Sequence, residues 1–224
     1  MTGVATMAGQ APEDAPKLGD AVALADVAEP THLTGIVLAA GAGTRMGTPK
    51  ALLHTADGTP WLRRASQLLA AAGCDPVLVV LGARADDARE LLPTPAGVVR
   101  AVVAADWSEG MSHSLRAGLA AAAAAAAAAA QTSTAALITL VDMPDLPLAV
   151  VRRVLGTSIT PTSLRQAVYN GRPGHPVLMG SAHWAALTAT LTGDRGARGY
   201  LVEHGVEEVE CADLFDGHDI DSMD

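Results

Sequence analysis

The sequence of 224 residues has few aromatic residues, few cysteines and no excess of basic residues. Only 3% of the residues are aromatic although 50% are hydrophobic, and part of the difference is an unbroken alanine run from Ala120 to Ala130. The two cysteines, Cys74 and Cys211, are too few for a disulfide framework or a cysteine-rich metal site. The net charge of −9 argues against a protein that follows the phosphates of a nucleic acid.

The sequence also has no segment typical of a membrane span or a secretory signal. Its longest apolar run, Leu119 to Ala130, is well below the roughly 20 residues that cross a bilayer. The first residues lack the basic stretch and the apolar stretch of a signal peptide. We therefore expect a cytoplasmic protein with neither a membrane nor a nucleic acid as its partner.

The charge is distributed unevenly along the chain. Residues 1–30 carry a net charge of −4 and residues 203–224 a net charge of −9, whereas residues 31–202 carry +4. A mildly basic body suits a small anionic substrate, although solvated surface charge explains the same composition. Residues 1–30 are rich in Ala, Pro, Asp and Glu without a sustained period, so we expect a flexible N-terminal extension. Residues 31–224 are expected to form a single domain.

Apolar runs and amphipathic segments alternate from residue 35 onward. Buried strands are predicted at 35–39, 77–81, 98–103 and 135–141, with shorter extended segments at 177–179 and 206–210. Helices are predicted at 60–72, 85–92, 112–130, 144–155, 183–191 and 197–204. This alternation predicts an α/β fold with a mostly parallel sheet that helices cover on both faces.

A glycine-rich loop follows the first predicted strand directly. Its glycines, Gly41 and Gly43, allow backbone N–H groups to approach an anion, and Arg45 and Lys50 add two cations. Ligands of open α/β sheets bind at such loops. The loop differs from the dinucleotide-binding fingerprint because Met46 stands where a third glycine is required. It also differs from a Walker loop, since Lys50 is neither preceded by glycine nor followed by Ser or Thr.

The segment LAAGAGTRMGTPKALL, residues 38–53, resembles the signature of MobA-like nucleotidyltransferases and, more narrowly, of the molybdenum cofactor cytidylyltransferases. Segments 106–116, 141–145 and 172–177 resemble further motifs of the same family in the same order, and together they extend through most of residues 34–221. The resemblance implies a three-layer α/β/α Rossmann-like nucleotidyltransferase fold for residues 31–224.

The resemblance also implies a reaction in which an acceptor phosphate attacks the α-phosphate of a nucleoside triphosphate and pyrophosphate leaves. Charge grows on the phosphate oxygens, so catalysis depends on positioning and electrostatic stabilisation. Arg45 on the triphosphate and Lys50 on the reacting phosphates are expected to be catalytic, and solvated surface cations are the weaker alternative. The residues of the loop expected to hold the nucleotide are Leu38, Ala39, Ala40, Gly41, Ala42, Gly43 and Lys50.

A metal site is predicted where the apolar strand 137–141 ends in Asp142. A buried acid is costly unless it is paired or metal-bound, and Mg²⁺ is usually held by one or two carboxylates together with substrate phosphates. We therefore expect Asp142 to be catalytic as a ligand of Mg²⁺, as the resemblance also implies. The alternative is an N-cap of the following helix, for which Asp145 is the better candidate.

A second metal ligand is implied by Asp219-Ile220-Asp221, which resembles the closing motif of the family and would place Asp221 at the metal. Ser222-Met223-Asp224 replaces the Thr-Pro-Glu-Asp expected after it. A frayed acidic tail is therefore the alternative for Asp221.

The segment before the long helix supplies further nucleotide contacts by resemblance, at Gly110 and Ser112. N–H groups at a helix start can meet a phosphate, while capping by Ser112 or Ser114 is the simpler role. Asp106 is expected to contact the base or ribose, or else to be an ordinary loop acid.

Three residues are candidates for binding the acceptor. By resemblance His175, in a turn-rich Pro-Gly-His-Pro segment, lies near the acceptor, although a structural histidine is a fair alternative. Arg195 and Arg198, which alternate with glycines, are expected to dock the phosphate of an anionic pterin.

The function implied by the resemblance is the transfer of CMP from CTP to the phosphate of molybdopterin. Cytosine is preferred over guanine because Ala40 stands where the related guanylyltransferases tend to have glycine. A molybdoenzyme or its chaperone is the implied protein partner. Alternatives are another phosphorylated acceptor, GTP as the donor, or a nucleotide- or cofactor-binding protein without turnover.

Overall fold

The strands form one seven-stranded sheet in the computed structural model, which describes residues 1–2, 32–93, 98–130 and 132–221. The predicted flexible extension, residues 1–30, lies almost entirely outside these residues. Along the sheet the strand order is β3-β2-β1-β4-β6-β5-β7. The strands are β1 (Leu33–Ala39), β2 (Val77–Leu81), β3 (Val99–Val103), β4 (Ala135–Leu140), β5 (Leu164–Tyr169), β6 (Arg172–Gly180) and β7 (Glu207–Glu210).

The sheet is mostly parallel, as the sequence predicts. Strands β1, β2, β3 and β4 all run in one direction, and β7 runs parallel to β5. Only β6 among these strands is antiparallel to its neighbours, β4 and β5. The central strands β1, β2 and β4 are almost wholly buried, which is why they appear in the sequence as continuous apolar runs.

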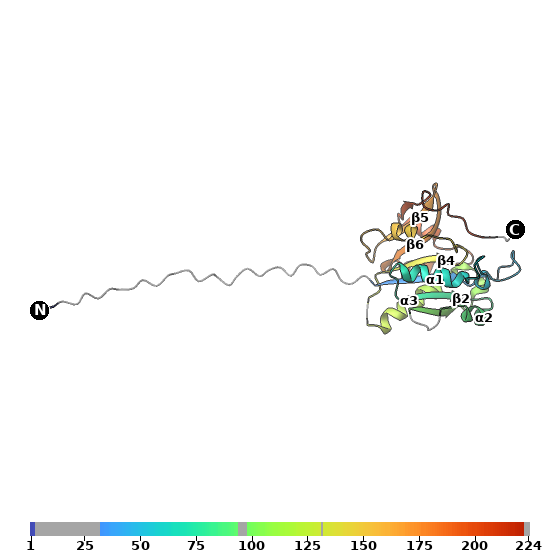
Figure 1. The fold of residues 1–224 in the computed structure, drawn as a ribbon, viewed down its shortest axis with the longest axis horizontal. Coiled ribbons are helices and arrows are strands. Elements are labelled where there is room, and N and C mark those ends of the chain that lie inside the picture. Colours follow the sequence, from blue (N-terminus) through green and yellow to red (C-terminus); the bar gives the residue numbers. More distant parts are fainter. Residues whose placement is uncertain (3–31, 94–97, 131, 222–224) are drawn as a thin grey trace. The chain divides into compact units, whose positions relative to one another are not determined.

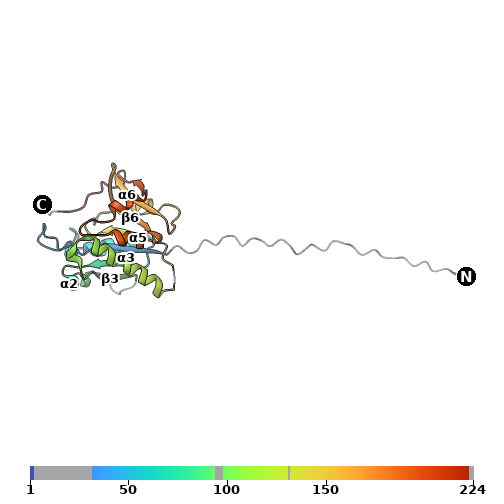
Figure 2. The same cartoon turned by 180° about the vertical axis from the view of Figure 1, so that it is seen from behind.

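Within the described residues, six α-helices cover the two faces of the sheet and give the predicted three layers (Figures 1 and 2). Val37 and Ala39 of β1 belong to a core with residues of α1, α2 and α4, whereas Ile36 and Leu38 belong to a core with residues of α3, α5 and α6. Alternate residues of a strand face opposite sides, so one strand serves both cores. The helices are α1 (Trp61–Ala71), α2 (Ala85–Glu90), α3 (Met111–Ala128), α4 (Leu148–Leu155), α5 (Trp184–Thr190) and α6 (Arg198–Glu203).

The path of the chain brings two distant segments together at one edge of the sheet. After β1 the chain builds β2 and β3 on one side and then returns to place β4 on the other side of β1. Leu38 near the end of β1 is paired with Leu140 at the end of β4. Such a switch in strand order is where open α/β sheets bind ligands, and here it joins the glycine loop to Asp142.

The strand pair β5–β6 was not predicted in full. The sequence predicts only residues 177–179 as extended, and the preceding Pro-Gly-His-Pro segment, residues 173–176, as a rigid turn-rich segment. Strand β4 pairs only with residues 177–180 of β6, Pro173 pairs with Val168 of β5 alone, and Pro176 lies at the irregularity in the β5–β6 pairing. Missing amide hydrogens are therefore tolerated there.

Two predicted helix caps are wrong. The N-cap of α3 is Gly110, so Ser112 and Ser114 lie inside the helix rather than before it. The N-cap of α4 is Pro147, so the helix begins later than predicted and Asp145 does not cap it. In the described part of the chain, no helix has the length and apolar character needed to cross a membrane.

Candidate active site

A cavity of 510 Å³ lies at the carboxyl ends of β1 and β4. The glycine loop forms one wall, and Lys50 and Asp142 lie beside it. The segment that begins α3 closes the opposite side. The lining residues are Leu38, Ala39, Ala40, Gly41, Ala42, Gly43, Thr44, Lys50, Trp107, Ser108, Gly110, Met111, Ser114, Leu140, Val141, Asp142 and Asp194.

The shape of the glycine loop depends on Gly43. Its φ of +62° lies in the left-handed region, and a Cβ there would stand 1.9 Å from the carbonyl oxygen of Thr48. The main-chain nitrogen of Met46 donates to the carbonyl oxygen of Gly43, which closes the turn. Only glycine fits this position, and the tight turn leaves the backbone of residues 39–43 facing the cavity.

Lys50 connects the glycine loop to the acidic residues. Its Nζ donates to Oδ2 of Asp142 at 2.8 Å and to Oδ1 of Asp221 at 2.5 Å. The side chains of Lys50 and Asp142 are only 18% and 13% exposed, whereas that of Asp221 is 53% exposed. Asp221, for which a frayed tail was the alternative, therefore lies at the predicted site.

Burial and pairing act in opposite directions on these groups. Burial lowers the pKa of Lys50, but its hydrogen bonds to Asp142 and Asp221 outweigh this effect and the net shift is upward. Burial raises the pKa of Asp142, and the bond from Lys50 only partly offsets it. The hydrogen bond from Lys50 lowers the pKa of Asp221. Lys50 thus carries its charge, and the buried carboxylate of Asp142 depends on nearby positive charge.

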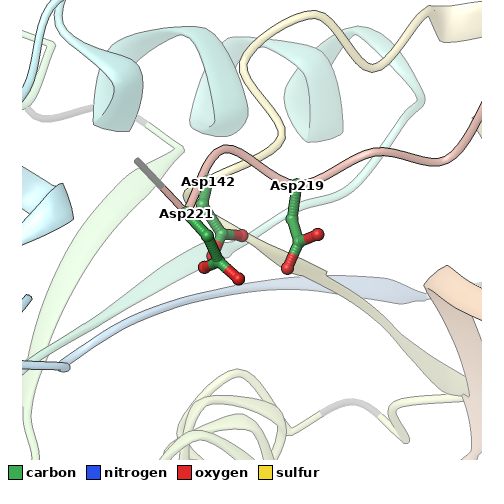
Figure 3. A group of neighbouring side chains, drawn as sticks. All are labelled: Asp142, Asp219 and Asp221. Carbon is green, nitrogen blue, oxygen red and sulfur yellow. The ribbon is translucent and has the colours of Figure 1, made fainter. Parts of the chain in front are cut away.

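Asp219 joins Asp142 and Asp221 in a cluster that the sequence analysis did not predict in full. One carboxylate oxygen from each lies within 4.8 Å of the others (Figure 3). Residues two apart in an extended segment point the same way, so the motif Asp-Ile-Asp already carried the signal. The other oxygen of Asp142, Oδ1, is buried without a hydrogen-bond partner among the described residues. Three carboxylates and an unpaired buried oxygen suit a hard divalent cation such as Mg²⁺.

Arg45 lies at the outer edge of the site. Its side chain is 83% exposed, with one guanidinium nitrogen 3.8 Å from Oδ2 of Asp221, and it does not line the cavity. An exposed arginine of this kind can reach a bound anion by changing rotamer.

The start of α3 contributes a different set of residues from the predicted one. Gly110 lines the cavity, but Ser112 is fully buried outside the lining and Ser114 faces the cavity instead. Asp106 is exposed and also outside the lining, whereas its neighbour Trp107 lines the cavity.

The loop 192–195 also reaches this cavity, through Asp194, which no motif of the sequence indicates. The main-chain nitrogen of Ser112 donates to the carbonyl oxygen of Gly193 at 3.1 Å. Gly110 has a φ of +119°, and a Cβ there would stand 2.5 Å from the backbone of Gly193. This close backbone approach places Asp194 at the cavity.

A second cavity of 230 Å³ contains two of the three predicted acceptor-binding residues. His175 and Arg198 line it, but Arg195 is exposed outside the lining. Burial lowers the pKa of His175 to about 4, so the imidazole is neutral at pH 7. Leu38 and Met111 line both cavities, which therefore lie next to each other.

Comparison with known proteins identifies relatives along most of the chain. Residues 35–209 match the MobA-like NTP transferase domain. The chain is 36% identical over 204 residues to nicotine blue oxidoreductase from Paenarthrobacter nicotinovorans, covering 86% of this chain and 93% of that protein.

Solved structures share the fold. Rv0371c from Mycobacterium tuberculosis H37Rv superimposes with a TM-score of 0.64 at 27% identity, over 81% of this chain and 88% of that one. A structure of the same protein in complex with manganese gives a TM-score of 0.59 at 25% identity, over the same shares of the two chains. A nucleotidyl transferase from Methanothermobacter thermautotroptrophicus gives 0.67 at 21% identity, over 85% of this chain and 92% of that one.

Proposed function

Because the chain belongs to the family of the MobA-like NTP transferase domain, we propose that it transfers CMP from CTP to the phosphate of molybdopterin and releases pyrophosphate. One observation carries the proposal. The glycine loop, Lys50 and Asp142 of the acidic cluster line one cavity, and a second cavity adjoins it across Leu38 and Met111. Two adjoining cavities suit a nucleotide donor and an acceptor.

The roles of the residues follow from the charge that develops in the reaction. An oxygen of the acceptor phosphate forms a bond to the α-phosphorus of CTP, while the bond from that phosphorus to the bridging oxygen of the β-phosphate breaks. Backbone N–H groups of residues 39–43 hold the triphosphate. Lys50 lies 2.8 Å from Asp142, where its ammonium stabilises charge on the reacting phosphates. Arg45 reaches the outer phosphates from the solvent side.

The acidic cluster of Asp142, Asp219 and Asp221 is proposed to hold Mg²⁺. When bound, the ion supplies Lewis-acid stabilisation of the phosphate oxygens. The unpaired Oδ1 of Asp142 and the manganese complex of the related Rv0371C support a divalent cation. Lys50 screens Asp142 and Asp221 from each other, so the carboxylates remain close together.

The choice of substrates rests on fewer residues. Ala40 in the cavity wall supports CTP over GTP, by resemblance to the cytidylyltransferases. Arg198 and the neutral His175 in the second cavity support an anionic heterocyclic acceptor. Arg195 is proposed to assist as an exposed cation at this side of the site. A molybdoenzyme or its chaperone is the proposed recipient of the product.

The decisive test offers CTP, GTP, ATP and UTP separately with molybdopterin and Mg²⁺ and measures pyrophosphate release. The proposal expects release with CTP above the other three nucleotides. Preference for GTP would overturn the choice of base, and release only with a sugar or polyol phosphate would overturn the acceptor. Binding of CTP without release under any condition would identify a non-catalytic nucleotide-binding protein.

A second candidate function is favoured by the 36% identity to nicotine blue oxidoreductase. In that case the chain would catalyse an oxidation–reduction of nicotine blue rather than transfer a nucleotide. The assay follows the reduction of nicotine blue by its absorbance, with NADH or NADPH added as the electron donor. Asp142→Asn separates the two candidates, because a ligand of a phosphate-bound metal has no assigned part in that reduction.

A further inference from the structure

The second cavity has apolar walls and three polar lining residues. Leu38, Leu115, Ile138, Val177 and Leu201 are among the apolar lining, and Gln166, His175 and Arg198 are polar. Its volume of 230 Å³ is below the roughly 300–1,000 Å³ of pockets for drug-sized ligands. A cavity of this size and lining suits one flat fused-ring group.

Gln166 differs from the other two polar residues in being held rigidly. It lies in the middle of β5, is only 8% exposed, and pairs with Val177 of β6 and Glu208 of β7. Its side-chain Nε2 donates to the main-chain oxygen of Gly174 at 3.1 Å. Burial of an amide is costly unless its polar atoms are bonded, so a buried glutamine in a cavity wall needs a reason.

The bond to Gly174 fixes which way the amide of Gln166 faces. A carbonyl oxygen can only accept a hydrogen bond, so the nitrogen of the amide must be the atom that faces Gly174. The oxygen Oε1 is then left as an acceptor, and no hydrogen bond within residues 32–93, 98–130 and 132–221 uses it. Gln166 lines the cavity, and Oε1 is not among the side-chain atoms that are both fully enclosed and without a partner, so it is accessible to a group bound there.

We infer that Gln166 positions the acceptor substrate, a flat heterocycle bound between the apolar walls. Its Oε1 accepts a hydrogen bond from a ring N–H of this heterocycle. This inference rests on the proposed function only in taking the second cavity as the acceptor site. A hydrogen-bond-accepting oxygen fixed in an apolar cavity selects strongly for a ligand whose ring N–H faces that oxygen, because other ligands leave the oxygen unpaired.

The orientation of a ring bound at Gln166 matters for catalysis because the first cavity adjoins the second. Leu38 and Met111 separate the two cavities, so a ring held at Gln166 can direct a substituent past Met111 toward the nucleotide. Arg198, which also lines the second cavity, supplies a cation for an anionic substituent. Gln166 thus sets the direction in which the acceptor phosphate points.

The test uses pterin-6-carboxylate and its N3-methyl derivative as probes, with binding followed by pterin fluorescence. In the wild-type protein we expect the parent pterin to bind at least tenfold more tightly than the methylated one. In Gln166→Met, which keeps the length of the side chain, this difference should vanish. Gln67→Leu is the matched control, because Gln67 is exposed on α1 and does not line this cavity.

The outcomes separate this inference from the proposed function. Equal affinity of the wild type for both pterins, absence of binding, or an unchanged preference in Gln166→Met would each overturn the inference. If Gln166→Met weakened CTP binding to the same extent as pterin binding, the role of Gln166 would be structural. This result would also overturn the inference. A preference that depends on Gln166, in a protein that releases no pyrophosphate from any nucleotide, would support the inference and reject the proposed transferase function.

Discussion

The main-chain nitrogen of Ile220 donates a hydrogen bond to the main-chain oxygen of Asp142, with 3.0 Å between the two atoms. This bond attaches the C-terminal segment to the end of β4. Asp219 and Asp221 flank Ile220, so their carboxylates are brought to that of Asp142 (Figure 3). An acidic cluster assembled from residues almost 80 positions apart is therefore held by this backbone contact as well as by the bonds of Lys50 to Asp142 and Asp221.

Asp142→Asn should abolish most transferase activity while leaving the fold intact. The amide keeps the volume of the side chain but removes the charge that faces Lys50 and the proposed metal. We expect kcat for pyrophosphate release to fall by about 10²–10³-fold. Asp145→Asn is the control, because Asp145 is an exposed acid on the same loop that pairs with Arg64. Equal activity in both variants would contradict the assignment of Asp142.

Asp219→Asn and Asp221→Asn should each weaken divalent metal binding. Removing one of three carboxylates lowers the negative charge offered to the cation, so we expect affinity for Mn²⁺ to fall roughly tenfold or more. Titration calorimetry with Mn²⁺ measures this directly. Asp216→Asn serves as the comparison, since Asp216 lies in the same segment but bonds to His218. A normal Mn²⁺ affinity in Asp219→Asn would restrict the site to the two residues predicted from sequence.

Lys50→Met should lower both activity and the free energy of unfolding at pH 7. The buried carboxylate of Asp142 loses its partner, which we expect to cost about 1–3 kcal/mol. The pKa of Asp142 in the folded variant then rises further above the pKa of the same group in the unfolded chain. As the pH falls, the folded state therefore binds a proton at Asp142 before the unfolded state does. Stability of the variant relative to wild type should therefore improve as the pH falls below the new pKa. Urea unfolding at several pH values tests the sign, and a deficit that grows in acid would contradict it.

Gly110→Ala and Gly193→Ala should differ in their effect on stability although both glycines have positive φ. At Gly110 a Cβ would stand 2.5 Å from the backbone of Gly193, whereas at Gly193 it would meet nothing within 4 Å. We expect Gly193→Ala to cost about 1 kcal/mol from conformation alone and Gly110→Ala to cost more than about 2 kcal/mol. Chemical denaturation measures both values. Equal losses of unfolding free energy in the two variants would show that loop 192–195 can move away from the start of α3 without cost.

His175→Gln should change how stability varies with pH in moderate acid. Burial lowers the pKa of His175 to about 4, from an ordinary value near 6.5. Between these values the unfolded chain binds a proton that the folded chain does not, so stability rises with pH across this window. The wild type should lose about 1–3 kcal/mol more than the variant between pH 7 and pH 4. Parallel pH profiles for the two proteins would contradict a buried neutral histidine.

The sequence was sufficient for the strands that are buried on both faces and for the loop between β1 and η1 (Lys50–Leu52). Val77–Leu81 is predicted to the residue, because a parallel strand buried on both sides is apolar throughout. The pair β5–β6 was only partly predicted, since Gln166, Pro173 and Pro176 break the apolar pattern. Gln166 and Pro173 line the second cavity, so they do not belong to the continuous apolar core that makes a buried strand recognisable.

For the candidate site, the residues on the glycine loop and at the end of β4 were predictable because they follow buried strands directly. Asp194, Trp107 and Gln166 were not, because their place in the site comes from packing between segments distant in the chain. Asp194 reaches the first cavity only through the contact of Gly193 with the start of α3. A one-dimensional pattern contains no trace of such a contact.

The polar groups of the two adjoining cavities lie mostly on different stretches of the chain. Apart from Asp194, the larger one is built from residues 38–142, whereas the polar groups of the smaller one all lie in residues 166–198. Under the proposed function, the polar contacts to the two ligands can therefore change separately during evolution. Substitutions in the later stretch can recruit a new second ligand while the earlier stretch is inherited unchanged, so descendants of one ancestral protein can come to process chemically different compounds.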